Sequence, residues 1–311
     1  MMNRTLLAYA VLYVVWGSTY LAMRIAVETL PPFLTGAVRF LLAGMVLLGW
    51  GLWRRQAPVS RGHLWSALTS GLLLIVGGNA SVMWAMKTVP SGVGALLVAT
   101  TPMWMVLLSR ERTSRRTWVG IVLGLCGVGL LMNPLQSTST GPLPLLPMFL
   151  LLFASATWAA GSLVPRRLPA HPSNAAASGL QMVCGGGALL LLAFLVGEPW
   201  SFSAVQASGR SIVAVAYLAL FGSLLGFTTY GWLMRVEPPA RVSTYAYVNP
   251  VVAVLLGATV AGEVLTPQML VASSVIVLAV IIIVRRRPVE RAGGGSSARS
   301  GVASSDRVDS L

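Results

Sequence analysis

Long apolar runs, separated by short polar connectors, follow one another along most of the chain. A membrane-spanning helix needs roughly 20 mostly apolar residues, whereas the strands of a membrane barrel are about half as long and alternate in polarity. These runs do not alternate, so the pattern predicts an all-α integral membrane protein with ten transmembrane helices. The predicted spans are Thr5–Met23, Phe33–Trp53, Leu64–Met86, Ser91–Ser109, Trp118–Met132, Leu146–Val164, Ala176–Gly197, Ile212–Leu233, Val242–Ala261 and Pro267–Val284.

Composition agrees with this assignment. Of the 311 residues, 56% are hydrophobic and 10% are charged, whereas a soluble domain carries about 25% charged residues. Ten spans use nearly the whole chain and leave no room for a large soluble domain. Cys126 and Cys184 both fall inside apolar runs, which favours small core residues over a disulfide or a metal site. Residues 285–311 are rich in Gly, Ser and Ala, and we expect a disordered cytoplasmic tail there.

The basic residues predict the orientation. The formal net charge is +14, but no basic stripe with interleaved aromatic residues suggests nucleic-acid binding. Instead, 18 of the 22 basic residues lie at the termini and in alternate connectors. Because cytoplasmic loops carry the excess of Lys and Arg, both termini are predicted to be cytoplasmic. The residues that decide this are Arg4, Arg54, Arg55, Arg61, Arg110, Arg112, Arg115, Arg116, Arg166, Arg167, Arg235, Arg241, Arg285, Arg286, Arg287, Arg291, Arg299 and Arg307.

The two halves of the chain share a weak internal repeat. Five spans in each half mean that the second half enters the membrane from the opposite side. The pattern therefore predicts two inverted-topology five-helix repeats, at residues 5–134 and 146–284, with a substrate site near the membrane midplane between them and transport by alternating access. The matching positions are Trp16 with Trp158 and Arg24 with Arg166, then Trp84–Lys87 with Trp232–Arg235 and Thr101-Pro102 with Asn249-Pro250.

Two prolines occupy equivalent positions deep in the fourth and ninth spans. Pro102 and Pro250 each remove a backbone hydrogen bond and free a carbonyl group. Such a group is tolerated in a membrane where it lines a cavity. A simple packing kink is the alternative for either proline, and their symmetric placement favours the cavity.

Several short motifs carry a family resemblance. They are Trp16-Gly17-Ser18, Val38-Arg39-Phe40, Pro90-Ser91-Gly92 with Thr101-Pro102, Trp118-Val119-Gly120 with Gly124 and Gly127, Tyr217–Ser223, Ser243–Pro250 and Gly262-Glu263. In this order and spacing they resemble the two EamA domains of the drug/metabolite transporter superfamily, over residues 5–284. The resemblance implies a ten-helix exporter of small metabolites in the bacterial inner membrane, with spans three, four, eight and nine around a central cavity. The exported compounds would be amino acids, their derivatives or drug-like molecules.

One departure from the family pattern concerns the fourth span. This span and its loop are shorter than their counterparts in the second half by roughly one helical turn. The Gly-Glu step at Gly262-Glu263 is replaced by Arg110-Glu111 in the first half. Gating on that side is therefore less well defined by the resemblance.

Polar and aromatic residues on those four spans are the candidates for substrate binding. Asn79 and Asn249 are the strongest, because an amide both donates and accepts hydrogen bonds. Tyr and Trp would offer walls for apolar parts of a substrate. Hydrogen bonding between helices is the alternative role for each polar residue. The predicted substrate-binding residues are Asn79, Trp84, Thr101, Tyr230, Trp232, Tyr245, Tyr247 and Asn249.

Arg39 is the only charge inside the predicted spans. A charged side chain at the centre of a spanning helix costs about 2.5–3.5 kcal/mol on insertion scales. Arg39 is predicted to serve either in an ion pair with Glu28, structural or at an outer gate, or as the contact for a substrate carboxylate. Glu28 also has Arg24 as an i,i+4 neighbour on the same helix.

The predicted spans contain no Asp, Glu or His at mid-membrane depth. This disfavours a proton-coupled multidrug exporter, which would use such groups as a proton relay. It also argues against an intramembrane enzyme, and no catalytic residue, cofactor or metal is expected. A non-transporting membrane scaffold stays as an alternative. The expected partners are a small-molecule substrate and the lipid bilayer; the sequence leaves monomer or homodimer, the coupling ion and the substrate open.

Overall fold

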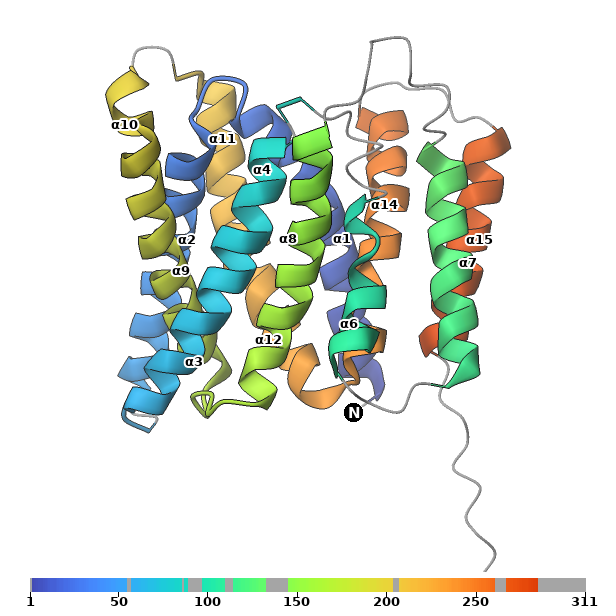
Figure 1. Cartoon of the computed structure of the whole chain (residues 1–311), viewed down its shortest axis with the longest axis horizontal. Helices are drawn as coiled ribbons and strands as arrows, with labels where there is room; N and C mark the ends of the chain where they lie inside the picture. Colours follow the sequence, from blue (N-terminus) through green and yellow to red (C-terminus); the bar gives the residue numbers. More distant parts are fainter. Residues whose placement is uncertain are drawn as a thin grey trace, which may run out of the picture.

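The computed structural model describes residues 2–54, 57–85, 87–88, 97–109, 114–132, 145–203, 207–260 and 267–284, and regular secondary structure in these ranges is entirely helical. The predicted all-α class is confirmed for this part of the chain. Figure 1 shows the helices standing side by side, with α1 beginning at the lower end of the bundle. The predicted tail, 285–311, lies outside the described residues, as do Arg110-Glu111 and Gly262-Glu263.

Six helices within the described ranges are long and apolar enough to cross a membrane: Asn3–Ala26, Pro32–Trp53, Arg61–Ala85, Leu145–Arg166, Asn174–Val196 and Gly209–Val236. They match predicted spans one, two, three, six, seven and eight. The first two are α1 (Met2–Ala26) and α2 (Pro32–Trp53). Next come α8 (Leu145–Leu163), continued by the 3₁₀ turn η3 (Val164–Arg166), and α9 (Asn174–Val196), which is followed by the short α10 (Glu198–Ser201).

The other four predicted spans coincide with helices whose described portions are shorter. They are α6 (Thr101–Ser109), α7 (Arg115–Met132), α14 (Tyr245–Val260) and α15 (Pro267–Val284). Two predicted boundaries are wrong. Within the range predicted as span four, a turn at Ala99–Thr100 precedes α6, and residues 91–96 lie outside the described part. The range predicted as span nine is broken at Ser243–Thr244, between the short α13 (Pro239–Val242) and α14.

The break before α14 has a local cause. The Ser243 hydroxyl donates to the carbonyl of Ala240 at 3.2 Å, and the Thr244 hydroxyl donates to the carbonyl of Arg241 at 2.6 Å. Ser and Thr side chains that bond to nearby carbonyls in this way compete with the helical ladder. The chain therefore makes a turn where its apolar pattern predicts a continuous helix.

Two of the long helices contain a π-helical segment near their middle. In the third span, η1 (Leu72–Ala80) lies between α3 (Arg61–Gly71) and α4 (Ser81–Ala85). In the eighth span, η5 (Leu218–Leu225) lies between α11 (Gly209–Tyr217) and α12 (Gly226–Val236). π-Helical turns are rare and occur frequently at functional sites. Their presence in spans three and eight marks these two helices for attention.

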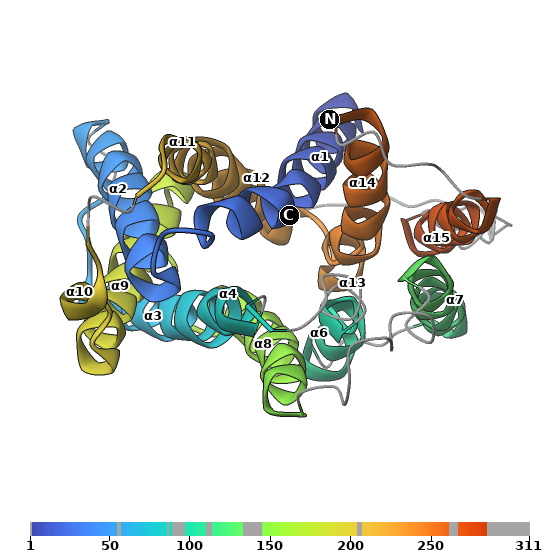
Figure 2. The same ribbon diagram turned by 90° about the horizontal axis from the view of Figure 1, so that it is seen from above.

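Glycine allows α2 and α9 to pack backbone against backbone. A Cβ atom at Gly44 would lie 2.9 Å from the amide nitrogen of Val183, and one at Gly179 would lie 2.5 Å from that of Leu48. Any larger residue at either position would push the helices apart. Elsewhere α7 packs on α15, α1 on α14, and α6 on α8. Figure 2 shows these helices from above, with α7 and α15 at one end of the molecule and α2 and α9 toward the other.

Large apolar side chains cover the outside of the bundle. Leu7, Phe149, Leu195 and Val213 are among those that are well exposed. Such an apolar surface is unfavourable in water and suits contact with lipid. Several polar residues are buried instead, among them Arg39, Ser223 and Asn249. Polarity is thus concentrated inside the bundle, where the cavity described next is found.

Candidate functional site

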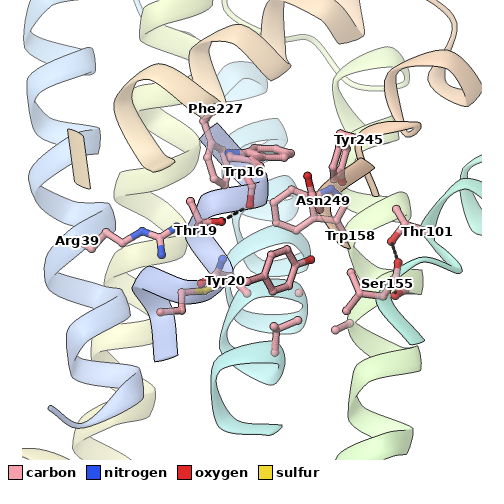
Figure 3. Close-up of a pocket in the computed structure, with 16 residues that line it drawn as sticks. Trp16, Thr19, Tyr20, Arg39, Thr101, Ser155, Trp158, Phe227, Tyr245 and Asn249 are labelled. Carbon is pink, nitrogen blue, oxygen red and sulfur yellow. Dashed lines mark hydrogen bonds between the residues drawn. The ribbon is translucent and has the colours of Figure 1, made fainter. Parts of the chain in front are cut away.

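A cavity lies inside the bundle between helices from both halves of the chain (Figure 3). The space free of protein atoms there is about 620 Å³, a figure that includes the part open to the outside. The lining residues are Trp16, Thr19, Tyr20 and Met23 of α1, Arg39 of α2, Gly78 and Asn79 of η1, Val82 of α4, Val98 and Thr101 at the start of the fourth span, Ala154, Ser155 and Trp158 of α8, Phe227 of α12, and Tyr245 and Asn249 of α14.

Aromatic rings form one boundary of the cavity. Trp16 stands at their centre, with ring centroids 5.5 Å from Trp158, 5.7 Å from Phe227, 5.0 Å from Tyr230 and 4.8 Å from Tyr245. We call these five residues the aromatic layer. Most of the contacts are tilted or edge-to-face, the arrangements that aromatic rings prefer.

The aromatic layer lies on the side of the cavity nearer the end of the bundle where α1 begins. The lining residues of α1 run from Trp16 away from that end to Met23, and those of α14 run from Tyr245 to Asn249. The Nε1–H of Trp16 donates to the carbonyl of Gly222 at 3.1 Å, which fixes the central ring. The layer therefore separates the cavity from the end of the bundle that carries the N-terminus.

Hydrogen bonds hold the helices together below the aromatic layer. Tyr13 of α1 bonds to Thr244 at 2.6 Å, between their hydroxyl groups. Arg166 of η3 donates to the carbonyls of Met234 and Glu237, at 3.1 and 2.8 Å. These contacts join α1 to the start of α14 and α8 to the end of α12. Hydrogen bonds thus tie these helices together between the cavity and the end of the bundle that carries the N-terminus.

Arg39 is the one charged residue among the described residues that line the cavity. Its side chain is 3% exposed, its Nε donates to the Ser223 hydroxyl at 2.9 Å, and its guanidinium carbon lies 4.4 Å from the centroid of the Phe40 ring. Its Nη1 has no hydrogen-bond partner among the described residues. Leaving a buried charged donor unsatisfied costs about 1–3 kcal/mol or more, so this nitrogen calls for an explanation.

Two amide oxygens of the lining also lack hydrogen-bond partners. These are Oδ1 of Asn79, at the end of η1, and Oδ1 of Asn249, on α14. Each can accept a hydrogen bond from a bound molecule. With the Nε1–H of Trp158, which also lacks a partner among the described residues, the cavity offers one cationic donor, one neutral donor and two neutral acceptors.

The fourth span shows how the carbonyls freed near Pro102 are satisfied. Pro102 lies in the first turn of α6, directly after the turn at Ala99–Thr100. The hydroxyl of Thr101 donates to the carbonyl of Val98 at 2.7 Å, and that of Ser155 donates to the carbonyl of Leu97 at 3.2 Å. Side chains thus occupy these carbonyls, whereas Pro250 lies within the continuous helix α14.

The structure brings five of the predicted polar and aromatic site residues to the cavity: Arg39, Asn79, Thr101, Tyr245 and Asn249. Tyr230 belongs to the aromatic layer and bonds to Ser162. Trp84, Trp232 and Tyr247 are not among the lining residues, and Tyr247 packs against Gly124 and donates to the carbonyl of Ile121 at 3.3 Å. Glu28 is exposed and makes no ion pair with Arg39, because the Arg39 Nε is bonded to Ser223 instead.

Half of the lining residues come from spans other than three, four, eight and nine. Trp16, Thr19 and Tyr20 come from span one, and Ser155 and Trp158 come from span six. A signal for two of them exists in the sequence, because Trp16 and Trp158 are matching positions of the internal repeat. A tryptophan kept at the same position of both halves could have identified spans one and six as cavity walls.

The chain matches the model of the EamA-like transporter family twice, at residues 4–133 and 145–285. "Uncharacterized inner membrane transporter YedA" of Escherichia coli strain K12 is 39% identical over 259 residues, which cover 82% of each protein. "Probable amino-acid metabolite efflux pump" of Salmonella typhimurium is 25% identical over 270 residues, 83% of this chain and 87% of the relative. "Protein PecM" of Dickeya dadantii is 29% identical over 251 residues, 78% and 80%.

A solved crystal structure shares the fold. It superimposes with a TM-score of 0.72 over 90% of this chain and 97% of the other, at 20% sequence identity. Together with the double family match and the 39% identical relative, the apolar helices around a polar cavity establish that this chain belongs to the EamA-like transporter family of the drug/metabolite transporter superfamily, as its sequence motifs predicted.

Proposed function

We propose that this protein exports small metabolites, amino acids or their derivatives, across the bacterial inner membrane by alternating access between two inverted five-helix repeats. The observation that carries the proposal is the cavity itself. It lies between the two halves, it is lined by both, and the aromatic layer bounds it on one side. A site between two halves suits alternate exposure of a substrate to the two faces of a membrane.

The packing of the helices supports two equivalent halves. When the spans are numbered from one to ten, α2 on α9 pairs span two with span seven, and α7 on α15 pairs span five with span ten. The contact of α1 with α14, spans one and nine, has its counterpart in that of α8 with α6, spans six and four. If each span is replaced by its counterpart in the other half, each of these four contacts becomes a contact that is also present. A two-fold repeat requires such matching pairs.

The π-helical segments lie at equivalent positions of the two halves. η1 begins at Leu72 in the third span, and η5 begins at Leu218 in the eighth. The separation of these two residues along the chain is about the same as that of the matching positions in the internal repeat. An odd number of spans in each repeat gives the halves opposite orientation. With Arg54 and Arg61 on the inner side, both termini face the cytoplasm, and the end of the bundle that carries the N-terminus is the cytoplasmic end.

The substrate class rests on two points. The relative from Salmonella typhimurium is named for amino-acid metabolite efflux, and the bacterial relative YedA is named an inner membrane transporter. The cavity combines an arginine, two amides and several aromatic rings, which together provide contacts for the polar and apolar parts of a small metabolite.

A metabolite screen tests the proposed function. Extracellular metabolites are measured for cells that overproduce the protein, for cells that lack it, and for cells that produce a variant with Ala154→Trp, which places a large side chain in the cavity. Accumulation of one or more small metabolites outside the overproducing cells alone supports export. Purified protein that accelerates no solute flux from proteoliposomes loaded with those metabolites would instead favour a membrane scaffold.

A further inference from the structure

The free guanidinium nitrogen of Arg39 is the feature of the cavity that most needs a ligand. Arg39 lies on α2 and lines the cavity, and only 3% of its surface is exposed. Buried polar groups almost always have a hydrogen-bond partner, and an exception points to a bound molecule, water or ion. Its Nη1 has none among the residues that the structure describes.

The surroundings of Arg39 leave its positive charge uncompensated. No Asp or Glu occurs among the described residues that line the cavity. The one bond of Arg39 with a side chain goes to the neutral hydroxyl of Ser223 at 2.9 Å. Glu28, the acidic residue predicted as its partner, is exposed. The cavity therefore favours an anionic group and disfavours a cation.

The other contacts of Arg39 orient its side chain without using the free nitrogen. The Nε–Ser223 bond ties the guanidinium to η5, and the Phe40 ring lies 4.4 Å from its central carbon. In Figure 3 the side chain extends from α2 toward Thr19 and the cavity, and Tyr245 and Asn249 stand on the opposite side, with Trp16 and Tyr20 between. A guanidinium held in this way is preorganised for a planar oxyanion.

We propose that Arg39 is the specificity-determining residue of the transporter, and that its substrates are small organic carboxylates whose carboxylate binds the free guanidinium nitrogen. This inference rests on the proposed function and narrows its substrate class. The rest of the substrate would lie along Trp16 and Tyr20 and place a hydrogen-bond donor at Oδ1 of Asn249 or Asn79. Amino acids satisfy this pattern, whereas organic amines without a carboxylate do not.

The first test compares exported compounds between variants. Extracellular metabolites are measured for cells that overproduce the wild-type protein, Arg39→Gln or Arg39→Lys at matched membrane levels. We expect carboxylates to dominate the wild-type set, their efflux to fall about ten-fold or more with Arg39→Gln, and Arg39→Lys to retain part of it, because loss of a charge-assisted hydrogen bond is that costly. Ser223→Ala removes the partner of Nε but keeps the charge, so it should lower efflux much less.

A second variant changes the charge of the cavity without touching Arg39. Asn79→Asp keeps the size of the side chain and adds a negative charge to the lining of the cavity, which disfavours a bound carboxylate. In proteoliposomes, efflux of L-phenylalanine and of phenylethylamine, the same molecule without its carboxylate, is compared. The wild type should prefer phenylalanine over the amine, and Asn79→Asp should lower or reverse that preference.

The outcomes separate this inference from the proposed function. If the wild-type protein exports nothing, the proposed function fails and the inference fails with it. If it exports compounds that lack a carboxylate, or if efflux is equal for wild type and for correctly inserted Arg39→Gln, the inference alone is wrong. An unchanged preference in Asn79→Asp likewise contradicts the placement of the carboxylate in this cavity.

Discussion

Trp16 and Trp158 occupy the same position in the two repeated halves of the sequence, and their rings meet edge to face with centroids 5.5 Å apart and an interplanar angle of 81°. In the proposed arrangement of two inverted repeats, equivalent residues of the two halves touch each other only close to the axis that relates the halves. Under that proposal the axis passes through this contact, beside the cavity. The aromatic layer forms around it, so any relative motion of the halves has to change this contact.

The Asn249→Ala variant tests whether the substrate binds next to Asn249. Replacing it with Ala removes a free acceptor of the cavity. We expect Asn249→Ala to lower efflux of the exported metabolites several-fold while protein level and membrane insertion stay near those of the wild type. Ser274→Ala, on the exposed surface of α15, is the control and should not change efflux. Unchanged efflux in Asn249→Ala would remove this residue from the binding site.

The Gly226→Ala variant tests how closely Gly226 packs against Trp16 in the aromatic layer. A Cβ atom at Gly226 would lie 2.3 Å from Nε1 of Trp16, whereas one at Gly187 would have no neighbour within 4 Å. Overpacking costs about 1–3 kcal/mol, and Gly-to-Ala in a helix otherwise stabilises by about 0.5–1 kcal/mol. Gly226→Ala should lower the unfolding temperature of the purified protein in detergent, and Gly187→Ala should leave it equal or slightly raise it. Equal temperatures would contradict the close contact with Trp16.

The Arg166→Ala variant tests whether hydrogen bonds of Arg166 control access at the end of the bundle that is proposed to face the cytoplasm. Arg166→Ala removes the donors to the carbonyls of Met234 and Glu237 and should favour the conformation that is open to the cytoplasm. Ser155→Cys, in a background without Cys126 and Cys184, provides a thiol in the cavity wall. Its labelling by an impermeant maleimide in inside-out vesicles should become several-fold faster with Arg166→Ala. No change in rate would show that these bonds do not control access.

Coupling to protons is tested with a pH gradient. The described residues that line the cavity include no Asp, Glu or His, so they provide no side chain of the kind that relays protons through a membrane. Efflux of a neutral or zwitterionic substrate from proteoliposomes should therefore continue at the same rate when an ionophore collapses the gradient. Efflux that stops under this treatment would establish the proton-coupled alternative.

Topology is tested by labelling from each side. Lys87 and Arg61 are both exposed and lie near opposite ends of the third span. With both termini in the cytoplasm, Lys87→Cys should react with an impermeant thiol reagent added to intact spheroplasts, and Arg61→Cys only after permeabilisation. The reverse result would invert the proposed orientation of the whole molecule.

The helices were predictable because a bilayer imposes a long, uniform apolar run on each span. The errors occur where local hydrogen bonds decide the backbone. Thr244 and Ser243 interrupt the ninth predicted span, and nothing in their hydropathy distinguishes them from other small polar residues of a membrane helix. The π-helical segments were missed for a similar reason, since one extra residue in a turn leaves the apolar pattern unchanged.

The site was predictable only in part. Asn79, Asn249 and Arg39 stood out because a polar group in lipid is costly, and all three line the cavity. Tyr247 has the same chemical character, yet it faces Gly124 of a neighbouring helix. Whether a side chain faces a cavity or a neighbour depends on the rotation of its helix, which hydropathy does not determine when every face of the helix is apolar.

The backbone contact between α2 and α9 has a mechanical consequence. At Gly44 and Gly179 the two helices meet without intervening side chains, so no change of rotamer can let one slide past the other. A shear between them would require main-chain atoms to collide. If the protein works by the proposed alternating access, we therefore expect this pair to move as one unit and the displacement that uncovers the cavity to arise at other helix contacts.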